Sequence, residues 1–195
     1  MKKNKEEKYI WDLNIEPKLE LLDEEMKHYI NVCKEKLGMV PNVILANASD
    51  QDRLKNFVNF YNRLMLKEGH LSKLEREMIA VVVSSCNKCF YCLIAHGAAV
   101  RQLSKNQYLG DELMINYRSA SLNKRHKLML DFSFKLTENP SKVDNSDRNI
   151  LREAGFSEEE ILEIVEVASF FNMSNRIAAG TDMRPNAEYH NMGRE

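Results

Sequence analysis

The sequence lacks a long hydrophobic run. Its densest apolar stretch, residues 78–83, is far shorter than the roughly 20 residues that a transmembrane helix needs. Residues 1–8 are mainly lysine and glutamate and contain no apolar core of the kind that a secretory signal requires. We therefore expect a soluble, cytoplasmic protein that has no membrane partner.

An excess of charge of one sign is also missing. Lysine and arginine number 28 against 29 aspartate and glutamate, and the two signs are interspersed along the chain. Nucleic-acid-binding domains usually carry a basic stripe or patch, so nucleic acid is not an expected partner. With 195 residues, of which 44% are hydrophobic, the chain can bury one real core. We expect a single domain over residues 1–195.

Convincing β-strand patterns are absent, whereas apolar residues recur at helical spacing along most of the chain. Such stripes cover residues 19–36, 54–65, 128–136 and 161–168. Ser72 followed by Glu75 is a capping-box pattern, in which the two side chains satisfy free N–H groups at the start of a helix. The sequence therefore predicts an all-α fold, a bundle of several helices, with a flexible tail over residues 1–12.

A faint internal repeat links the two halves of the chain. A shift of 85 residues superposes one set of residues, Ser72, Glu75, Ile79, Ser84 and Asn87, on a second set, Ser157, Glu160, Ile164, Ser169 and Asn172. If the repeat is real, each half contributes a helical hairpin, an active one at about 71–103 and a degenerate one at about 156–182. The alternative is coincidence between helices of similar pattern.

The chain has four cysteines but no export signal. A structural disulfide framework is therefore not expected, because the cytosol keeps ordinary thiols reduced. Cys33 stands alone on a predicted helix and is expected to pack as a small buried hydrophobe. Cys86, Cys89 and Cys92 fall within seven residues, so catalysis, metal binding and packing are all open for them.

A helix break is expected just before the second of these clustered cysteines. Ser84, Ser85 and Asn87 are modest helix formers whose side chains compete for backbone hydrogen bonds. If the helix stops near Asn87 and restarts, Cys89 lies in a first helical turn, where free N–H groups and the helix dipole stabilise a thiolate. One uninterrupted helix is the alternative, and it would remove this stabilisation.

The spacing of Cys89, Cys92 and His96 suits redox chemistry. Cys89 and Cys92 stand one helical turn apart, close enough for a disulfide at modest strain. His96 is four residues beyond Cys92, so its ring lies over the same face and can accept the thiol proton. The pattern predicts a redox dithiol in which Cys92 attacks an oxidant and Cys89 resolves the resulting sulfenic acid.

Glu77 is the candidate that would orient His96, as carboxylates do beside other catalytic bases. Because Glu75 and Arg76 flank it, a solvated position on a helix face is the ordinary alternative. The other histidines have no partner at informative spacing and are expected to be surface or structural residues, namely His28, His70, His126 and His190.

Two other interpretations of the cysteine cluster stay open. The set Cys86, Cys89, Cys92 and His96 offers four soft ligands at a spacing similar to that of an iron–sulfur or zinc site. Residues three apart on one helix drift around its axis by about 60° per step, however, so Cys86 should point away from Cys92. The other interpretation is a purely structural set of buried cysteines.

Glu77, Cys89, Cys92 and His96 also follow a fixed pattern, a glutamate, eleven residues, then Cys-x-x-Cys-x-x-x-His. This pattern resembles the signature of the AhpD-like alkylhydroperoxidases of the carboxymuconolactone decarboxylase superfamily, and the chain looks like their peroxidase-related subgroup. The similarity extends over nearly the whole chain, through segments such as LGMVPNVILANAS, NYRSA, FFNMSNR and TDMRPNAEYH.

The resemblance implies an all-helical fold assembled into dimers or trimers of dimers, and thiol-dependent reduction of hydroperoxides without metal, haem or flavin. In the family's scheme Glu77 and His96 relay a proton from Cys92, which attacks the peroxide oxygen. Cys89 then closes the disulfide, and an external dithiol reduces it.

Two positions depart from this scheme. Tyr91 stands where the best-known member has a second histidine, and Cys86 is an extra thiol near the site, so the roles of both stay open. Alternative functions are a protein or small-molecule disulfide oxidoreductase, a Cys/His metal-binding helical module and a non-catalytic helical oligomer. Decarboxylation would leave the redox cysteines without an explanation.

Overall fold

The computed structural model describes residues 9–194. Within this range the chain forms helices and no β-strand, which confirms the predicted all-α class. The helices are α1 (Glu24–Leu37), α2 (Asn42–Asn47), α3 (Gln51–Tyr61), α4 (Lys73–Cys86), α5 (Phe90–Ser104), α6 (Leu109–Asn116), α7 (Lys124–Glu138), α8 (Asn145–Glu153) and α9 (Glu158–Gly180). Short helical segments add η1 (Leu19–Leu21), η2 (Asn62–Leu66), η3 (Pro140–Lys142) and η4 (Ala187–His190).

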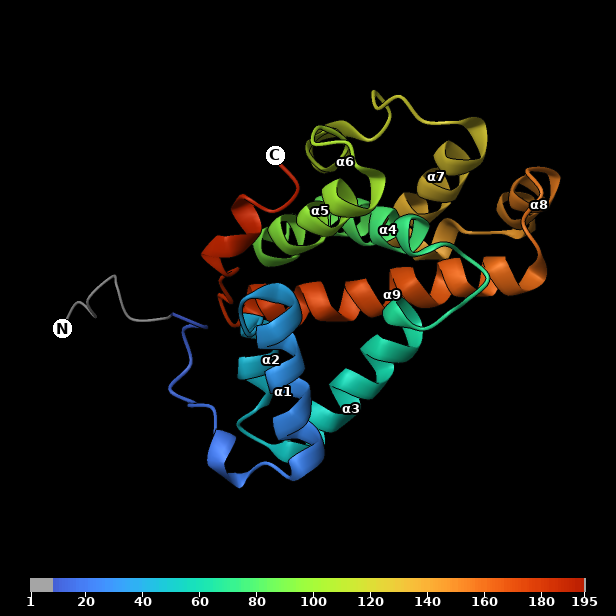
Figure 1. The fold of residues 1–195 in the computed structure, drawn as a ribbon. Helices are drawn as coiled ribbons and strands as arrows, with labels where there is room; N and C mark the ends of the chain where they lie inside the picture. The colour runs from blue at the N-terminus through green and yellow to red at the C-terminus, as the bar shows by residue number, and fades with distance from the viewer. Residues whose placement is uncertain (1–8, 195) are drawn as a thin grey trace.

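Helix α9 crosses the middle of the molecule, with α4 to α7 on one side and α1 to α3 on the other (Figure 1). The larger apolar core surrounds α4 and includes Met78, Val82 and Ile164, all fully buried. A second core joins the first three helices through residues such as Met26 and Leu54. The chain therefore has two packed regions with α9 between them.

Helix α4 is the most deeply buried helix of the larger core, since every residue from 75 to 84 is buried. Its start is the predicted capping box, because Ser72 Oγ accepts from the Glu75 backbone N–H and the Glu75 carboxylate accepts from the Ser72 N–H. The cap satisfies free N–H groups in the first turn of α4.

The capping box at the start of α9 forms as well, through Ser157 and Glu160. Arg125 of α7 pairs with both capping glutamates, Glu75 and Glu160, one through each terminal nitrogen. A single guanidinium therefore ties the first turns of α4 and α9 together.

The degenerate second hairpin of the proposed repeat does not form. Where α4 ends at Cys86, the corresponding part of α9 continues unbroken to Gly180. The two equivalent asparagines differ accordingly. Asn172 lies inside its helix and donates to the Ala168 carbonyl one turn earlier, whereas Asn87 is the C-cap of α4.

The loop between η2 and α4 is fixed by Arg76, which is 1% exposed. Its guanidinium donates to the carbonyls of Leu64, Lys67 and Leu71, and it lies 3.4 Å from the carboxylate of Glu163. This buried cation holds the loop against both α4 and α9.

Part of the predicted flexible tail lies outside the described residues, since residues 1–8 are not described. In residues 9–12 the structure differs from that prediction. The N–H of Asp12 donates to the carbonyl of Thr181 at 2.8 Å, and the N–H of Arg184 donates to the carbonyl of Ile10 at 2.9 Å. These residues are paired with the segment that follows α9.

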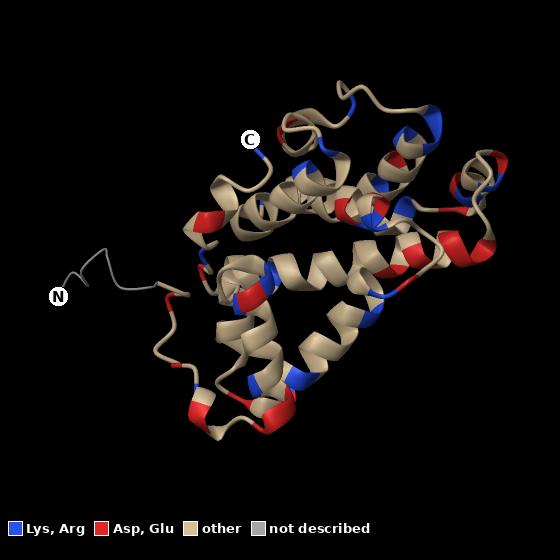
Figure 2. Cartoon of the chain, in the orientation of Figure 1, with Lys and Arg blue, Asp and Glu red and all other residues tan. Residues whose placement is uncertain are grey.

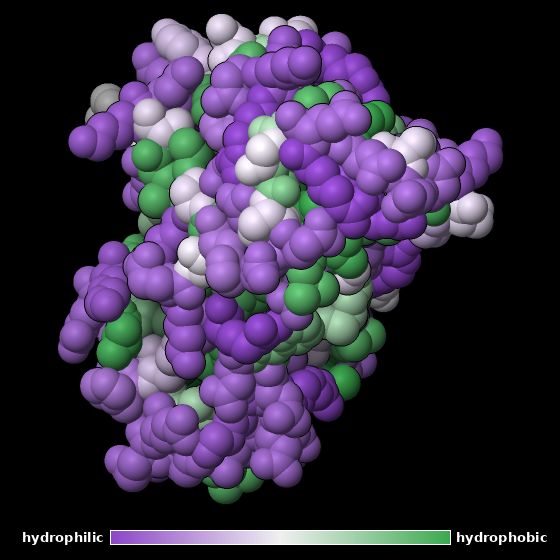
Figure 3. All heavy atoms as spheres, turned by 90° about the vertical axis from the view of Figure 1, so that its right-hand side faces the viewer, coloured by the Kyte–Doolittle hydropathy of each residue, from purple (hydrophilic) through white to green (hydrophobic). Residues whose placement is uncertain are grey.

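Acidic and basic residues are interspersed along the chain, and α5 and the middle of α9 carry few of either (Figure 2). Figure 3 shows the face that lies at the right-hand side of Figure 1. Hydrophilic residues predominate on this face, and hydrophobic side chains gather in a hollow between the upper and lower parts of the view. Within residues 9–194, no helix combines the length and apolar character that crossing a bilayer demands.

Candidate active site

The predicted helix break forms between α4 and α5. Asn87 caps α4, Lys88 takes a left-handed conformation with φ 52°, and Cys89 is the N-cap of α5 in an extended conformation. The N–H of Cys89 donates to the carbonyl of Ser84 at 3.0 Å, which closes the turn. This geometry places the Cys89 sulfur beside the free N–H groups of the first turn of α5.

Both cysteines of the motif are free thiols in contact with each other. The Cys92 thiol donates a hydrogen bond to the Cys89 sulfur, and this is the largest influence on Cys89. Together with the backbone N–H groups of Cys92 and Tyr91, it outweighs the cost of burial and lowers the pKa of Cys89 to about 7. The prediction that the start of a helix stabilises the Cys89 thiolate agrees with this pKa.

The order of ionisation differs from the prediction that His96 would make Cys92 the thiolate. Its hydrogen bond to Cys89 and its own burial raise the pKa of Cys92 well above the usual value for a thiol. Cys92 is 1% exposed and lies inside the first turn, whereas Cys89 lies at its open end. In the reduced pair the first proton therefore leaves Cys89, and Cys92 keeps the one that remains.

Glu77 is buried and bonded to His96. Its Oε2 lies 2.7 Å from the Nδ1 of His96, across the break between α4 and α5. Phe171 of α9 packs edge-on against the imidazole, with the ring centroids 4.5 Å apart. The solvated alternative for Glu77 is therefore wrong, and the carboxylate fixes the orientation of the imidazole.

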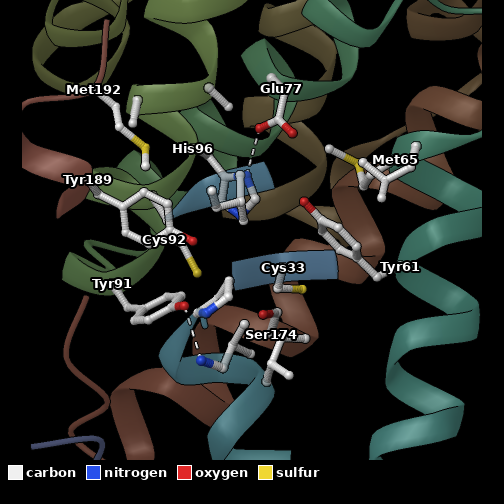
Figure 4. A pocket seen from close by; sticks show the side chains of 18 of the residues that line it. Cys33, Tyr61, Met65, Glu77, Tyr91, Cys92, His96, Ser174, Tyr189 and Met192 are labelled. Carbon is white, nitrogen blue, oxygen red and sulfur yellow. Dashed lines mark hydrogen bonds and ion pairs between the residues drawn. The ribbon is translucent and has the colours of Figure 1, made fainter. Parts of the chain in front are cut away.

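A cavity of about 630 Å³ brings Cys92, His96 and Glu77 together. In Figure 4 the Cys92 sulfur and the His96 ring both point into this space, on the same side as Tyr189. Cys89 does not line the cavity. Of the two sulfurs, Cys92 is thus the one that a molecule in the cavity meets.

Tyr91, the residue directly before Cys92, has a structural partner. Its hydroxyl accepts a hydrogen bond from the N–H of Val43 at 3.1 Å and contacts the hydroxyl of Tyr189. Burial raises the pKa of Tyr91 well above its ordinary value, so it remains a neutral phenol. Tyr91 thereby anchors α2 to the first turn of α5.

Sequence reasoning missed Asn175, which is 1% exposed. Its Nδ2 donates to Ser84 Oγ at 3.0 Å, its Oδ1 accepts from Asn87 Nδ2 at 3.0 Å, and it also contacts the Cys92 thiol. Ser174 contacts the same thiol. No spacing rule points to residues more than 80 positions away, and the only signal was their place in the shared segment FFNMSNR.

The segment after α9 closes one wall of the cavity with Tyr189 and Met192. Arg101 of α5, 2% exposed, holds this segment by donating to the carbonyls of both residues, at 3.0 Å and 2.9 Å. Arg194 adds a paired ion contact with Asp111 of α6. The wall is therefore attached to the same helix that carries Cys92.

The other two cysteines are not part of the dithiol. Cys33 is buried, as predicted, and lines the wall of the cavity on α1. Cys86 is half-buried and outside the cavity lining, and burial raises its pKa. Within residues 9–194, no group of three or more His, Cys, Asp or Glu side chains is arranged to hold a metal ion.

Part of the chain matches a known protein family. Residues 51–107 match the model of the carboxymuconolactone decarboxylase family. A search among curated proteins found no similar sequence.

Solved structures match over nearly the full chain. An uncharacterized peroxidase-related protein from Silicibacter sp. TM1040 is 52% identical over 100% of both chains, with a TM-score of 0.92. A second, from Ralstonia eutropha JMP134 and described as an alkylhydroperoxidase AhpD core, is 39% identical over 95% of this chain and 97% of its own, with a TM-score of 0.90. The debrominase Bmp8, 18% identical over 94% of this chain and 97% of its own with a TM-score of 0.78, shares the fold. The chain therefore belongs to the AhpD-like, peroxidase-related proteins of the carboxymuconolactone decarboxylase superfamily.

Proposed function

We propose that the protein is a thiol-dependent peroxidase that reduces organic hydroperoxides through the Cys89 and Cys92 dithiol. The observation that carries the proposal is the position of Cys92, whose sulfur faces a cavity shared with the Glu77 and His96 pair. Cys89, Cys92, His96 and Glu77 are the catalytic residues. The reaction needs only these groups and an external dithiol as reductant.

In the first step Cys92 is the nucleophile. Above about pH 7 the reduced pair holds one proton, and its transfer from Cys92 to Cys89 exposes a Cys92 thiolate without adding a second negative charge. This thiolate attacks the distal peroxide oxygen, so an S–O bond forms as the O–O bond breaks. The alkoxide that leaves takes a proton from the His96 imidazolium, which Glu77 stabilises.

In the second step Cys89 resolves the sulfenic acid. His96, now neutral, accepts the Cys89 proton, and the Cys89 sulfur attacks the sulfur of Cys92. A disulfide forms, and the departing hydroxide takes that proton and leaves as water. Two thiols have lost two electrons, and the hydroperoxide has become an alcohol and water. An external dithiol then reduces the disulfide by thiol exchange.

The proposal is tested by adding one equivalent of tert-butyl hydroperoxide to the reduced protein. Intact mass should fall by about two hydrogens, and peptide mapping should assign the loss to a Cys89 to Cys92 bridge. Cys92→Ser should form no bridge and Cys89→Ser should stop at a sulfenic acid, whereas Cys86→Ser should behave as the native protein does. Slow oxidation scattered over cysteines and methionines would exclude the mechanism.

A disulfide oxidoreductase would use the same two thiols with another oxidant. Both sulfurs are almost fully buried, at 2% and 1% exposed, which favours a small oxidant over a protein disulfide. Oxidation of the reduced protein by a disulfide peptide at a rate equal to that with tert-butyl hydroperoxide would favour the oxidoreductase. Assembly into a homo-oligomer stays a separate prediction, which sedimentation would test.

A further inference from the structure

The cavity is elongated along one helix. Cys92, His96, Ala99 and Leu103 line it at intervals of four, three and four residues, which places them on one face of α5. Eleven residues at the rise of an α-helix cover roughly 16 Å. Cys92 is 1% exposed at one end and Leu103 is 46% exposed at the other, so the cavity leads from the reacting sulfur to the surface.

The walls between the two ends are mainly apolar. Phe57, Met65 and Phe170 face the same space as the helix α5 residues. Several polar groups in the walls are already bonded within the protein, since His96 pairs with Glu77 and the Tyr29 hydroxyl contacts Asn62 at 3.2 Å. A hydrocarbon body fits such walls, because it needs no polar partner and gains from leaving water.

The exposed part of the lining combines apolar side chains with positive charge. Leu37, Leu66 and Leu103 are all more than one-third exposed and line the cavity together with Lys36 and Lys73.

The charge balance of these exposed lining residues is positive. Lys73 has one weak partner, Glu68 at 3.8 Å, whose side chain is 98% exposed, and Lys36 makes no ion pair with any described residue. Among the described residues that line the cavity, the only carboxylate is Glu77, which lies at the deep end beside His96.

We propose that the substrate is the hydroperoxide of a free long-chain fatty acid. Its carboxylate lies between Lys36 and Lys73, its chain follows α5, and its peroxide group reaches Cys92. The inference rests on the proposed peroxidase activity and adds the substrate class. The reaction leaves the carboxylate unchanged and converts the hydroperoxide group to a hydroxyl group, with the electrons supplied by the dithiol.

The test compares disulfide formation under single-turnover conditions with three oxidants. They are a long-chain fatty-acid hydroperoxide, its methyl ester and tert-butyl hydroperoxide. The acid should react faster than its ester, and the difference should shrink at high salt, because the ester has the same chain without the charge. Lys36→Gln should slow the acid by about fivefold and leave the ester unchanged. Lys34→Gln, on the same helix but outside the cavity lining, is the matched control and should have no effect.

Equal rates for acid and ester, or equal effects of Lys36→Gln on both, would overturn the proposed substrate class. A phospholipid hydroperoxide reduced as fast as the free acid would overturn the choice of a free fatty acid. Disulfide formation with tert-butyl hydroperoxide but without any preference for the acid would leave the peroxidase proposal standing. No disulfide with any of the oxidants would overturn the peroxidase.

A binding measurement separates the two proposals further. Cys92→Ser cannot react, so titration of this variant with an unoxidised long-chain fatty acid reports on the cavity alone. Saturable binding that weakens in the double variant with Lys36→Gln supports the substrate class independently of the chemistry. Absence of saturable binding would contradict it.

Discussion

Asn87 and Asn175 are joined by a hydrogen bond of 3.0 Å between the side-chain nitrogen of the first and the side-chain oxygen of the second. This contact connects the turn before Cys89 to the helix behind Cys92. Asn175 uses its own nitrogen for Ser84, so one buried amide holds both sides of the turn. The geometry of the dithiol therefore depends on α9 as well as on the helices that carry the cysteines.

Asn175→Ala is expected to lower the free energy of unfolding by about 1–3 kcal/mol, because it leaves the buried Ser84 hydroxyl without its partner and removes one of the two oxygens to which Asn87 donates. The reduction potential of the dithiol should shift as well, since Asn175 contacts the Cys92 thiol. Urea denaturation and equilibration with glutathione measure the two effects. Asn149→Ala, an exposed position on α8, should change neither quantity, and an unchanged potential in Asn175→Ala would contradict the positioning role.

The Cys89 thiolate should appear as the pH rises through about 7. The sign follows from the lowered pKa: the thiol is mostly protonated below pH 7 and mostly ionised above it, whereas an ordinary cysteine remains protonated until about 8.5. Thiolate absorbance in the ultraviolet should rise over this range in native protein and in Cys86→Ser. Cys89→Ser should lose the transition, and Cys92→Ala should move it to higher pH because the largest stabilising hydrogen bond is gone. A transition only near pH 8.5 in native protein would contradict the assignment.

Glu77→Gln is expected to slow single-turnover disulfide formation by about 100-fold, since the amide retains the shape but cannot stabilise an imidazolium. The pH profile of the rate should change, which a purely structural role would not produce. Glu75→Gln is the matched control, two residues earlier on the same helix and bound to Arg125 outside the cavity. It should retain the rate. Equal rates for Glu77→Gln and native protein would remove the proton relay.

Arg76→Met should destabilise the fold by about 3–5 kcal/mol, because the Glu163 carboxylate would stay buried without its cation. Guanidinium denaturation measures this cost. Arg63→Met breaks the exposed ion pair with Glu166 and should cost no more than about 1 kcal/mol. Similar costs for the two variants would show that burial of Arg76 does not govern its contribution.

Local signals made the helix boundaries predictable. A capping box involves residues only three apart, so Ser72 and Glu75 determine where α4 begins. The break near Asn87 follows in the same way from side chains that compete with the helix backbone. The spacing of apolar residues does not distinguish a helix that stops from one that continues. For this reason the expected second hairpin within residues 156–182 was wrong, and one long helix, α9, lies there instead.

Site residues were predictable only where a spacing rule or the family pattern pointed to them. The spacing rules placed Cys89, Cys92 and His96 on one helix face. Glu77 lies on another helix, so its bond to His96 depends on how α4 packs on α5, and only the family pattern pointed to it. Asn175 was missed for the same reason, because its partners lie 88 and 91 residues away on another helix.

Those long separations also matter while the protein is being made. The dithiol leaves the ribosome more than 80 residues ahead of Asn175, and at usual synthesis rates this interval lasts roughly 4–16 seconds. Until α9 arrives, the nascent chain presents Cys89 and Cys92 without the amide that clamps their turn. We expect both thiols of a stalled chain ending before α9 to react with a small alkylating reagent, and the finished reduced protein to protect Cys92. Newly synthesised chains would therefore be the form most vulnerable to oxidants.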